Sequence, residues 1–452
     1  MSNHVNRRTF LKGSGTVLGG IAAGTTVVAA ERTDRFIVQT KGNRRLRGLE
    51  VVHEMPGVDF AVVRGSEKDV KRSSAVKSYA PDVEVELGLP EPSRKAPTVA
   101  DSTVGDEPLY PLQWDKQDLD VATAHETTTG SGTLVTVIDT GVAAGHPDLE
   151  VNEELSDNFT GDGLGSANPA GGYHGTHVGG IVAAQDNGAG VIGTAPDTEL
   201  VDCRVFSPNS LAAFADILAA LVYSANIGAD AANMSIGAYP VPRQGQGSFY
   251  GKVLNTVLTY ANRQGTLPVV SAGNDAADLQ HDKNVISLPN EGAQAMSIAA
   301  TGPVGFGWGD SGVESPAHSP ALYTNYGTNA VDIAAPGGNY SLAGMAEAED
   351  GDDFAPPWHY DLVLNTIALP TYATDSDGNV TGIASVDYTY SWVAGTSMAA
   401  PQVAGAAALV KSANPRYNAN QVESALERAA DVPPGYDKTY YGSGYLNVVE
   451  AL

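Results

Sequence analysis

The sequence contains a single cysteine, Cys203, among 452 residues. This excludes an intramolecular disulfide and any zinc or iron–sulfur site that needs several cysteines. Charged residues make up only 17%, and glycine (51) and proline (26) stay below the level typical of low-complexity chains. Because 42% of the residues are hydrophobic, we expect a folded protein with one large domain and one small one.

Basic residues are scarce, with 26 Lys and Arg against 52 Asp and Glu. They are also unevenly placed: residues 1–100 carry 16 basic and 11 acidic side chains, and residues 101–452 carry 10 and 41. The acidic part should repel nucleic acids and anionic membranes, so neither is expected as a partner. The acidity is consistent with solubility alone, or with adaptation to concentrated salt, which we favour.

The N-terminus combines Arg7-Arg8-Thr9-Phe10-Leu11-Lys12 with a mildly apolar stretch, Gly13–Ala30, that has no acidic residue before Glu31. This pattern predicts a twin-arginine export signal over residues 1–30. The alternative is a short membrane anchor. The stretch is rich in Gly and Thr and shorter than a typical span, so we expect a cleaved signal, a secreted extracellular protein and no membrane contact in the mature form.

Two folding units are expected after the signal. The pattern of residues 31–100 predicts a small α+β unit followed by an exposed linker. The expected strands are 35–39, 49–54, 58–63 and 83–87, the expected helix is 66–78, and the linker is 88–98. Residues 101–452 predict a parallel α/β domain. Its expected strands are 134–138, 200–206, 231–236, 267–271, 295–299 and 330–334, and its expected helices are 212–227, 251–264 and 397–412. Residues 338–390 form an acidic, aromatic insertion.

Three short motifs carry reactive side chains. Asp139 ends a buried strand in Val-Ile-Asp-Thr-Gly, His174 opens a small-residue helix in His-Gly-Thr-His, and Ser397 begins a helix in Gly-Thr-Ser-Met-Ala. Strand-to-helix junctions of a parallel sheet share one edge, so these side chains should meet there. A serine needs an imidazole to take its proton, and the imidazole needs a buried carboxylate.

A second group of polar atoms could stabilise an oxyanion. Asn274 follows the predicted strand 267–271, and its amide group can donate to a reacting carbonyl. The backbone N–H of Ser397 lies at a helix N-terminus and can supply the second donor. The backbone of the strand end Asn233–Gly237 could pair with an extended peptide.

Together these motifs resemble the subtilisin-like serine proteases (subtilases), in particular the halolysins, and the order Asp, His, Ser matches that family. The resemblance implies a three-layer catalytic domain and a ferredoxin-like prosegment that assists folding and inhibits the enzyme intramolecularly. It implies that Asp139 orients His174, the base, that Ser397 attacks, and that Asn274 binds the oxyanion. It also implies a monomer that cleaves protein and peptide substrates, with a substrate-binding edge formed by Ser235, Ile236, Gly237, Ala272 and Gly273.

The same resemblance implies structural Ca²⁺. The oxygen ligands would come from the Asp148 carboxylate, the Asn187 side chain and the carbonyl groups of Gln185, Ala189 and Val191. Glu107 could complete the shell. An acidic catalytic domain and a basic prosegment also suggest electrostatic docking, with the hypothesis that high salt weakens it.

Two positions depart from the family pattern: Gln402 replaces a histidine after Pro401, and Ala394 replaces an asparagine. Several alternatives stay open. Asp139 and Asp310 in two Asp-Thr/Ser-Gly motifs could form an aspartic protease. His174 and His177 could bind a metal, although His177 is expected to be structural. The chain could be a catalytically silent subtilase or a narrow processing protease. The sequence favours a secreted, autoprocessed serine endopeptidase.

Overall fold

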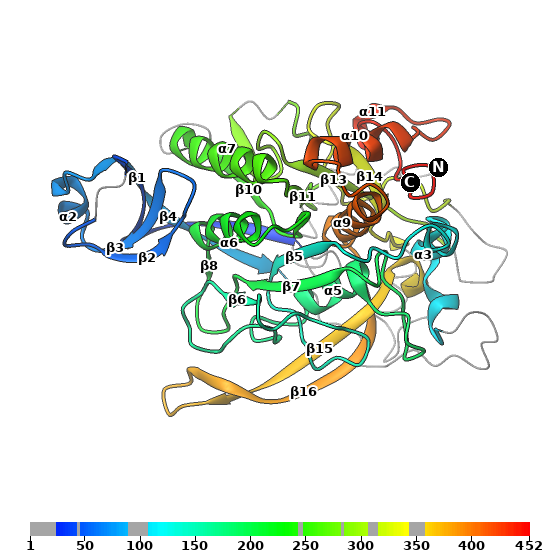
Figure 1. The fold of residues 1–452 in the computed structure, drawn as a ribbon, viewed down its shortest axis with the longest axis horizontal. Coiled ribbons are helices and arrows are strands. Elements are labelled where there is room, and N and C mark those ends of the chain that lie inside the picture. The colour runs from blue at the N-terminus through cyan, green and yellow to red at the C-terminus, as the bar shows by residue number, and fades with distance from the viewer. Residues whose placement is uncertain are drawn as a thin grey trace, which may run out of the picture.

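The computed structural model describes residues 24–42, 46–88, 107–242, 247–281, 284–305, 315–342 and 358–452. Figure 1 shows a small N-terminal unit at one side of a larger body, and a long hairpin that projects from that body. None of the helices within these ranges is both long and apolar enough to cross a membrane.

The larger body is built on a parallel sheet of seven strands, in the order β14-β13-β11-β9-β5-β7-β6. Each strand expected from an apolar run is present, with ends shifted by a few residues. The strands are β5 (Leu134–Asp139), β6 (Asp157–Asn158), β7 (Glu199–Arg204), β9 (Ala231–Met234), β11 (Leu267–Ser271), β13 (Met296–Thr301) and β14 (Ile333–Pro336). The predicted parallel α/β fold is therefore confirmed.

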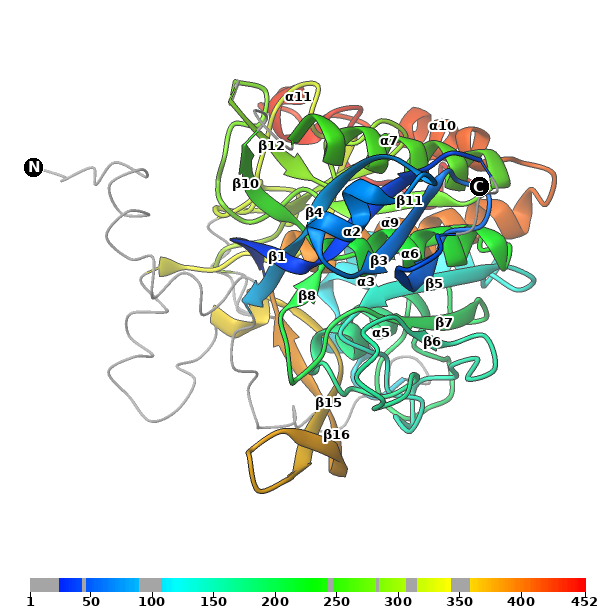
Figure 2. The same cartoon turned by 90° about the vertical axis from the view of Figure 1, so that its left-hand side faces the viewer.

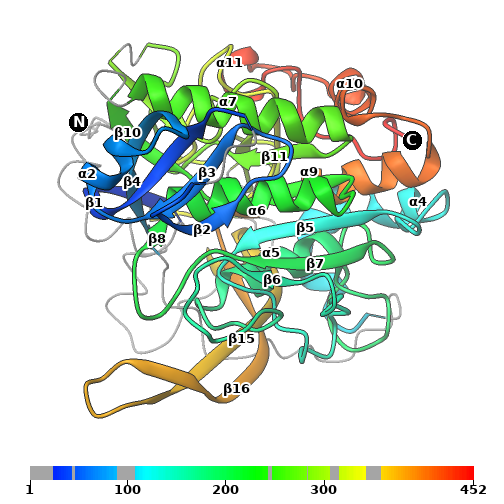
Figure 3. The ribbon, with the colours of Figure 1, turned by 60° about the vertical axis from the view of Figure 1, so that its left-hand side comes forward.

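Helices cover both faces of this sheet because its central strands are apolar on both sides. Along β5, Val135 and Val137 pack in one core with α5 (His174–Ala183) and α9 (Thr396–Ala413). Ile138 belongs to a second core with α6 (Phe214–Asn226) and α7 (Gly247–Gln264). Figure 3 shows α6 and α7 side by side. The result is the expected three-layer arrangement.

Shorter elements surround these layers. Ala212 and Ala213, expected to begin the helix at 212–227, instead form the strand β8, because they pair with Val85 and Glu84 of a distant strand. The remaining short elements are η2 (Tyr110–Leu112), α3 (Trp114–Asp118), α4 (Val121–His125), β10 (Ala238–Pro242), β12 (Val285–Leu288), η3 (Trp358–Asp361), α10 (Ala419–Ala429) and α11 (Lys438–Tyr441).

The N-terminal unit is an antiparallel sheet in the order β2-β3-β1-β4 with one short helix. The helix expected over 66–78 is wrong in its second half, because Ser73 is extended and Val76 pairs with Thr40. The first strand begins at Gly24, inside the predicted signal. The elements are β1 (Gly24–Thr40), β2 (Glu50–Glu54), β3 (Phe60–Arg64), α2 (Glu67–Arg72) and β4 (Val76–Gly88). The ferredoxin-like prosegment stays a prediction.

This unit packs against α6 and α7, which lie behind it in Figure 2. Ile37 and Phe60 share an apolar core with Phe214 of α6 and Leu254 of α7. The contact therefore buries apolar surface from both units, and apolar burial is the main source of stability in such interfaces.

Charged side chains are buried in the same contact. The guanidinium group of Arg35 lies 2.8 Å from the Asp82 carboxylate and pairs with Asp216 of α6. The Nε2 atom of His53 lies 2.8 Å from Asp216 Oδ1. Desolvation raises the pKa of Asp82 to about 6, although Arg35 opposes the shift. The two units are thus joined by a buried ion cluster as well as by apolar side chains.

The predicted insertion at 338–390 contains the projecting hairpin of β15 (Val363–Thr374) and β16 (Val380–Val393). Its inner half is buried and contacts α5, since Thr366 Oγ1 donates to Thr176 O at 2.8 Å. Its outer half is largely exposed. β16 leads directly to Gly395 and Ser397, so the hairpin fixes where the serine helix begins. Residues 343–357 of the insertion lie outside the described ranges.

The close approach of α5 to β15 depends on Gly180. A Cβ atom at Gly180 would lie 2.1 Å from Asn365 Oδ1 and from Thr366 Oγ1. We expect Gly180→Ala to lower the free energy of unfolding by about 1–3 kcal/mol, because the hairpin must move. Gly251→Ala in α7 is the matched control, since a Cβ there meets nothing within 4 Å; it should be neutral or stabilising. Urea unfolding in a Ser397→Ala background measures both, and equal stabilities would contradict the packing argument.

Candidate active site

The four candidate catalytic residues lie at one edge of the parallel sheet. Asp139 is the last residue of β5, and Asn274 follows the end of β11. His174 opens α5, and Ser397 is in the first turn of α9. All three candidate triad side chains are buried. The carboxyl edge of the sheet therefore gathers these groups, as parallel topology requires.

The acid and the base form a direct contact. His174 Nδ1 lies 2.8 Å from Asp139 Oδ1, and Thr140 N donates to the same oxygen at 2.7 Å. Among the described residues, His174 Nε2 has no hydrogen-bond partner. Asp139 therefore holds the ring through Nδ1 and leaves Nε2 as the atom that can take a proton.

Glycines permit this contact. Gly141 has a φ of 114°, in the region that favours glycine. A Cβ atom at Gly175 would lie 2.7 Å from Gly141 O. The start of α5 can therefore approach the turn after β5 only because both positions lack side chains.

The serine is attached to a third segment. Ser397 Oγ donates to Ser235 O at 3.1 Å, and Ser235 Oγ donates to Ser397 O at 2.7 Å. The structure thus joins Asp139 to His174 and Ser397 to Ser235. A hydrogen bond from Ser397 to the unpartnered His174 Nε2 is not formed among the described residues, so proton transfer requires the serine hydroxyl to leave the Ser235 carbonyl.

Asn274 is oriented by the residue before the serine. Its Oδ1 atom accepts hydrogen bonds from Thr396 N at 2.9 Å and from Thr396 Oγ1 at 2.8 Å. Because the carbonyl end of the amide faces Thr396, the Nδ2 end faces the other way. Thr396 also accepts from Gly273 N at 3.1 Å. The sequence analysis did not single out Thr396; its place next to Ser397 was the available signal.

The loop that carries Asn274 is held by Asn325. Asn325 Nδ2 donates to Ala272 O at 2.9 Å, and Asn325 Oδ1 accepts from Asp275 N at 3.0 Å. Gly273 has a φ of 99°, and a Cβ there would lie 2.4 Å from Asn325 Nδ2. Burial raises the pKa of Asp275 to about 6. The Ala272 carbonyl, expected at the substrate edge, is therefore bonded within the protein.

The segment Ser235–Gly237 lies beside the serine, at the end of β9. The Ile236 side chain is buried, so only its backbone can contribute to a binding edge. Asn233 Nδ2 donates to Ser235 Oγ at 2.9 Å and so orients the hydroxyl that bonds Ser397 O. Sequence reasoning missed the role of the Asn233 side chain, which depends on this contact.

His177 has a structural environment. Its Nε2 atom lies 3.2 Å from Ser391 O of β16. Burial, reinforced by the neighbouring His174, lowers the pKa of His177 to about 3, so the ring is neutral at pH 7. Within the described ranges no cluster of three His, Cys, Asp or Glu side chains is arranged to bind a metal. Cys203 is buried, and desolvation raises the pKa of its thiol.

The candidate calcium ligands, Asp148 and residues of the loop after α5, lie close together in the larger body. Asp148 Oδ2 accepts from Val191 N at 3.0 Å, while Asp148 Oδ1 is buried and has no partner among the described residues. Burial raises the pKa of Asp148 to about 6. The Asp148 carbonyl accepts from Gln185 N, and Asn187 Oδ1 accepts from Ala189 N. The unpartnered Asp148 oxygen fits a cation.

Glu107 binds the same loop differently from the expectation. Its carboxylate accepts from Asn187 N and Gly188 N at 2.5 Å each and from Gly190 N at 2.9 Å. It is nearly fully buried. These contacts to N–H groups occupy the carboxylate, so Glu107 fixes the loop and is not needed as a metal ligand.

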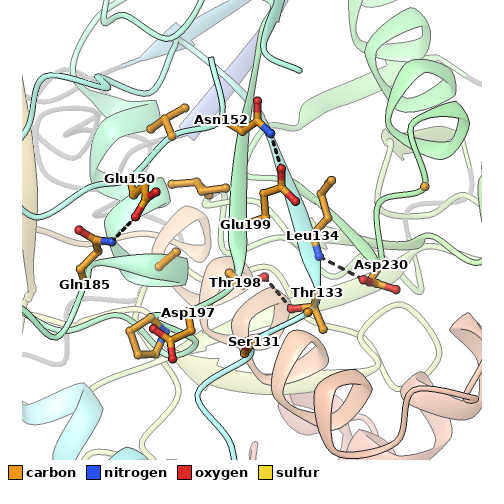
Figure 4. A pocket seen from close by; sticks show the side chains of 16 residues that line it. Ser131, Thr133, Leu134, Glu150, Asn152, Gln185, Asp197, Thr198, Glu199 and Asp230 are labelled. Atoms are coloured by element: carbon orange, nitrogen blue, oxygen red, sulfur yellow. Dashed lines mark hydrogen bonds between the residues drawn. The ribbon is translucent and has the colours of Figure 1, made fainter. Parts of the chain in front are cut away.

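A separate polar pocket of about 720 Å³ lies around the amino ends of β5 and β7. Figure 4 shows partners for three of its acids: Glu150 pairs with Gln185, Glu199 with Asn152, and Asp230 with the Leu134 backbone N–H. The fourth, Asp197, accepts from Thr129 Oγ1 at 2.5 Å. The pocket contains none of the four candidate catalytic residues, so the chemistry lies elsewhere.

A buried acid–histidine pair and a buried serine lie at the carboxyl edge of a parallel sheet that helices cover on both faces. These features are typical of an α/β serine peptidase. Residues 130–444 match the subtilase family. The chain belongs to the subtilase family and is a serine endopeptidase. This excludes the aspartic-protease alternative, whose second acid, Asp310, lies outside the described residues.

Curated relatives span most of the chain. Subtilisin BL of Lederbergia lenta is 31% identical over 327 residues, covering 72% of this chain and 91% of the relative. An alkaline protease of Alkalihalobacillus alcalophilus is 28% identical and covers 93% of this chain and 88% of its own. An extracellular protease of Xanthomonas campestris is 29% identical and covers 98% and 71%.

Solved structures support the same fold. A protease from Pseudoalteromonas arctica has a TM-score of 0.57 at 27% identity and covers 77% of this chain and 98% of its own. The epidermin leader peptide processing serine protease of Staphylococcus aureus has a TM-score of 0.69 and covers 93% and 98%. At 20% identity the second likeness concerns the fold alone.

The orientation of Asn274 leads to a kinetic prediction. We expect Asn274→Ala to lower kcat by about 10²–10³-fold with little change in KM, because an oxyanion donor acts mainly in the transition state. Steady-state cleavage of a chromogenic peptide measures this. Asn255→Ala in α7, which removes a hydrogen bond to Ala293 N, is the control. If the Asn274→Ala enzyme keeps the wild-type kcat, Asn274 does not stabilise the oxyanion.

Proposed function

We propose that the chain hydrolyses peptide bonds through an acyl-enzyme formed on Ser397. The observation that carries the proposal is the buried 2.8 Å contact between His174 Nδ1 and Asp139 Oδ1, which leaves Nε2 without a partner beside the serine helix. An imidazole held in this way is in a suitable position to act as a general base. The family membership of the chain supports the same roles.

In the proposed reaction, Ser397 Oγ attacks the substrate carbonyl carbon and its proton passes to His174 Nε2. The imidazolium formed is stabilised by Asp139. Asn274 Nδ2 and the Ser397 N–H donate to the oxyanion. His174 then returns the proton to the leaving amine, and the C–N bond breaks. A water molecule repeats the sequence on the ester and releases the acid product.

The substrate edge follows from the same segments. An extended peptide would lie along Ser235, Ile236 and Gly237 on one side and near Ala272 and Gly273 on the other. The support is the direct bonding of Ser235 to Ser397 and of Gly273 to Thr396. The Ala272 carbonyl, being bonded to Asn325, would contribute shape and not a hydrogen bond.

The protein is made as a zymogen in this proposal, with a signal at 1–30, a prosegment and linker at 31–100, and a catalytic domain at 101–452. The prosegment acts as an intramolecular inhibitor. Its support is the apolar and ionic contact of the N-terminal unit with α6 and α7. β4 also pairs with β8, which places the end of this unit against the catalytic domain.

These contacts bear on the salt hypothesis. Screening by salt acts strongly on exposed charges and weakly on buried ones. Arg35, Asp82 and Asp216 are all buried, so the contact itself favours docking that persists at high salt. The difference in net charge between the two units would then affect the rate of docking more than its strength.

Export is the last part of the proposal. The Arg7-Arg8 motif supports the twin-arginine route, and the relatives named above include alkaline and extracellular proteases. An acidic catalytic domain supports activity in concentrated salt. These features together favour a protein that acts outside the cell.

One substitution tests the nucleophile. Ser397→Ala should abolish both processing of the precursor and peptide cleavage, because the acyl-enzyme cannot form. The control is Ser412→Ala in the same helix, whose hydroxyl donates to Ser131 O; it should process and cleave normally. Gel analysis, N-terminal sequencing and peptide assays measure the outcome. Cleavage that survives Ser397→Ala would overturn the assignment.

We also propose that Asp148, the Asn187 side chain and the carbonyls of Gln185, Ala189 and Val191 hold Ca²⁺. The unpartnered Asp148 Oδ1 supports this. A bound ion would stabilise the loop after α5 and would take no part in the reaction.

Calcium should raise the thermal midpoint of the wild-type protein relative to a chelator, because an ion that binds only the folded state stabilises it. Asp148→Asn should lose that shift. Asp375→Asn is the control: it lies in the exposed hairpin turn and accepts from Asn379 N, and the shift should remain. Differential scanning calorimetry measures each midpoint. If a chelator leaves the midpoint of the wild-type protein unchanged, the proposed calcium site is wrong.

A further inference from the structure

A fully buried polar cluster lies outside the catalytic residues. It consists of Asp115 and Lys116 of α3, Thr194 of the loop after α5, and Gln402 of α9. None of these side chains reaches solvent. Lys116 Nζ donates to Gln402 Oε1 at 2.6 Å and to Thr194 Oγ1 at 2.8 Å. Its third hydrogen bond is to Ile181 O at 3.0 Å.

The ammonium and amide groups of the cluster are fully paired, whereas Asp115 Oδ1 has no partner among the described residues. The three N–H donors of the ammonium group meet three oxygen atoms. Gln402 uses both ends of its amide, since Oε1 accepts from Lys116 and Nε2 donates to Asp115 Oδ2 at 2.7 Å. Gln402 is the position at which the family pattern has histidine. One planar amide can link an ammonium group to a carboxylate, which explains the glutamine here.

Lys116 joins the two helices that begin at the catalytic residues. Ile181 is in the last turn of α5, which begins at His174, and Gln402 is in α9, which carries Ser397. The Ile181 carbonyl accepts from Thr194 N at 2.9 Å and not from the following turn of the helix, because Gln185 N donates to Asp148 O. A cation at a helix C-terminus is favourable.

A buried ion cluster adds little net stability, because removing its charges from water costs free energy. Desolvation lowers the pKa of Lys116 to about 8, although Asp115 opposes the shift. Apolar residues of similar size usually stabilise a core as well as a buried ion pair does. A role in fixing the relative position of helices therefore accounts for it better than stability does.

We propose that Lys116 and Gln402 are positioning residues that set the distance between α5 and α9 and thereby the approach of Ser397 Oγ to His174 Nε2. This inference rests on the proposed triad. In the structure the two atoms are held by different segments, so their approach depends on the spacing of the helices. A displacement of about 1 Å at a reacting centre can reduce a rate about 100-fold.

The test is Lys116→Met, which removes the ammonium group and keeps the length of the side chain. We expect kcat to fall about 10- to 100-fold with KM within about twofold, because the substrate edge does not contact the cluster. The rate of Ser397 labelling by a small fluorophosphonate should fall in parallel. Lys411→Met, at the other end of α9, removes a hydrogen bond to Tyr417 O and should leave both rates unchanged.

A double-mutant cycle adds a second measurement. If Lys116 and Gln402 act as one unit, Lys116→Met/Gln402→Met should be no slower than either single variant. Additive losses in the double variant would overturn the proposal. It would also be overturned if Lys116→Met kept kcat and the labelling rate within twofold of wild type, or if its loss were confined to KM. If Lys116→Met does not accumulate as folded mature enzyme, Thr194→Val carries the same test with a smaller expected fall. Absence of Ser397 labelling in the wild type would instead overturn the proposed function itself.

Discussion

The buried hydrogen bond between His174 and Asp139 is the constraint on which the site depends. A carboxylate that is shielded from water is costly without hydrogen-bond donors, and Thr140 N and His174 Nδ1 both donate to Asp139 Oδ1. The end of β5, the turn after it and the first residue of α5 must therefore keep one arrangement. Gly175 is needed because a side chain there would separate α5 from the turn after β5, and Gly141 is needed because its φ of 114° favours glycine.

Ser397, the proposed nucleophile, comes from a different part of the chain. α9 begins where β16 ends, and its first turn is fixed by Asn274 through Thr396 and by Ser235 through Ser397. The two halves of the site thus share no short connection. Their relative position follows from the packing of α5 against α9 in one apolar core and from the buried polar cluster between them.

Net charge does not predict how the N-terminal unit contacts the larger body. Residues 1–100 are net basic and residues 101–452 are acidic, which suggests attraction over a distance, although residues 24–88 alone carry 11 basic and 10 acidic side chains. The contact itself consists of apolar side chains such as Ile37 and Phe60 together with a few buried ions. Which charges are buried, and next to what, is decided by the packing of β1–β4 on α6 and α7.

Much of the fold and the catalytic set was predictable because the signals are local. An apolar run followed by Asp-Thr-Gly identifies the end of β5, and Gly-Thr-Ser identifies the start of α9. Predictions failed where pairing with distant residues overrode local preference, as at Ala212–Ala213 and Val76. Thr396 and Asn325 escaped notice because their roles exist only through contacts. Glu107 was expected as a further calcium ligand, but its carboxylate accepts from backbone N–H groups of the loop.

The amino-acid sequence by itself determined which reactive groups this protein has, in which order they occur, and that each is next to a strand end or a helix start. Only the tertiary structure decided how those groups are oriented. Lys116 and Gln402 are 286 positions apart and still share a 2.6 Å hydrogen bond. Such a partnership depends on packing geometry, which no local pattern encodes.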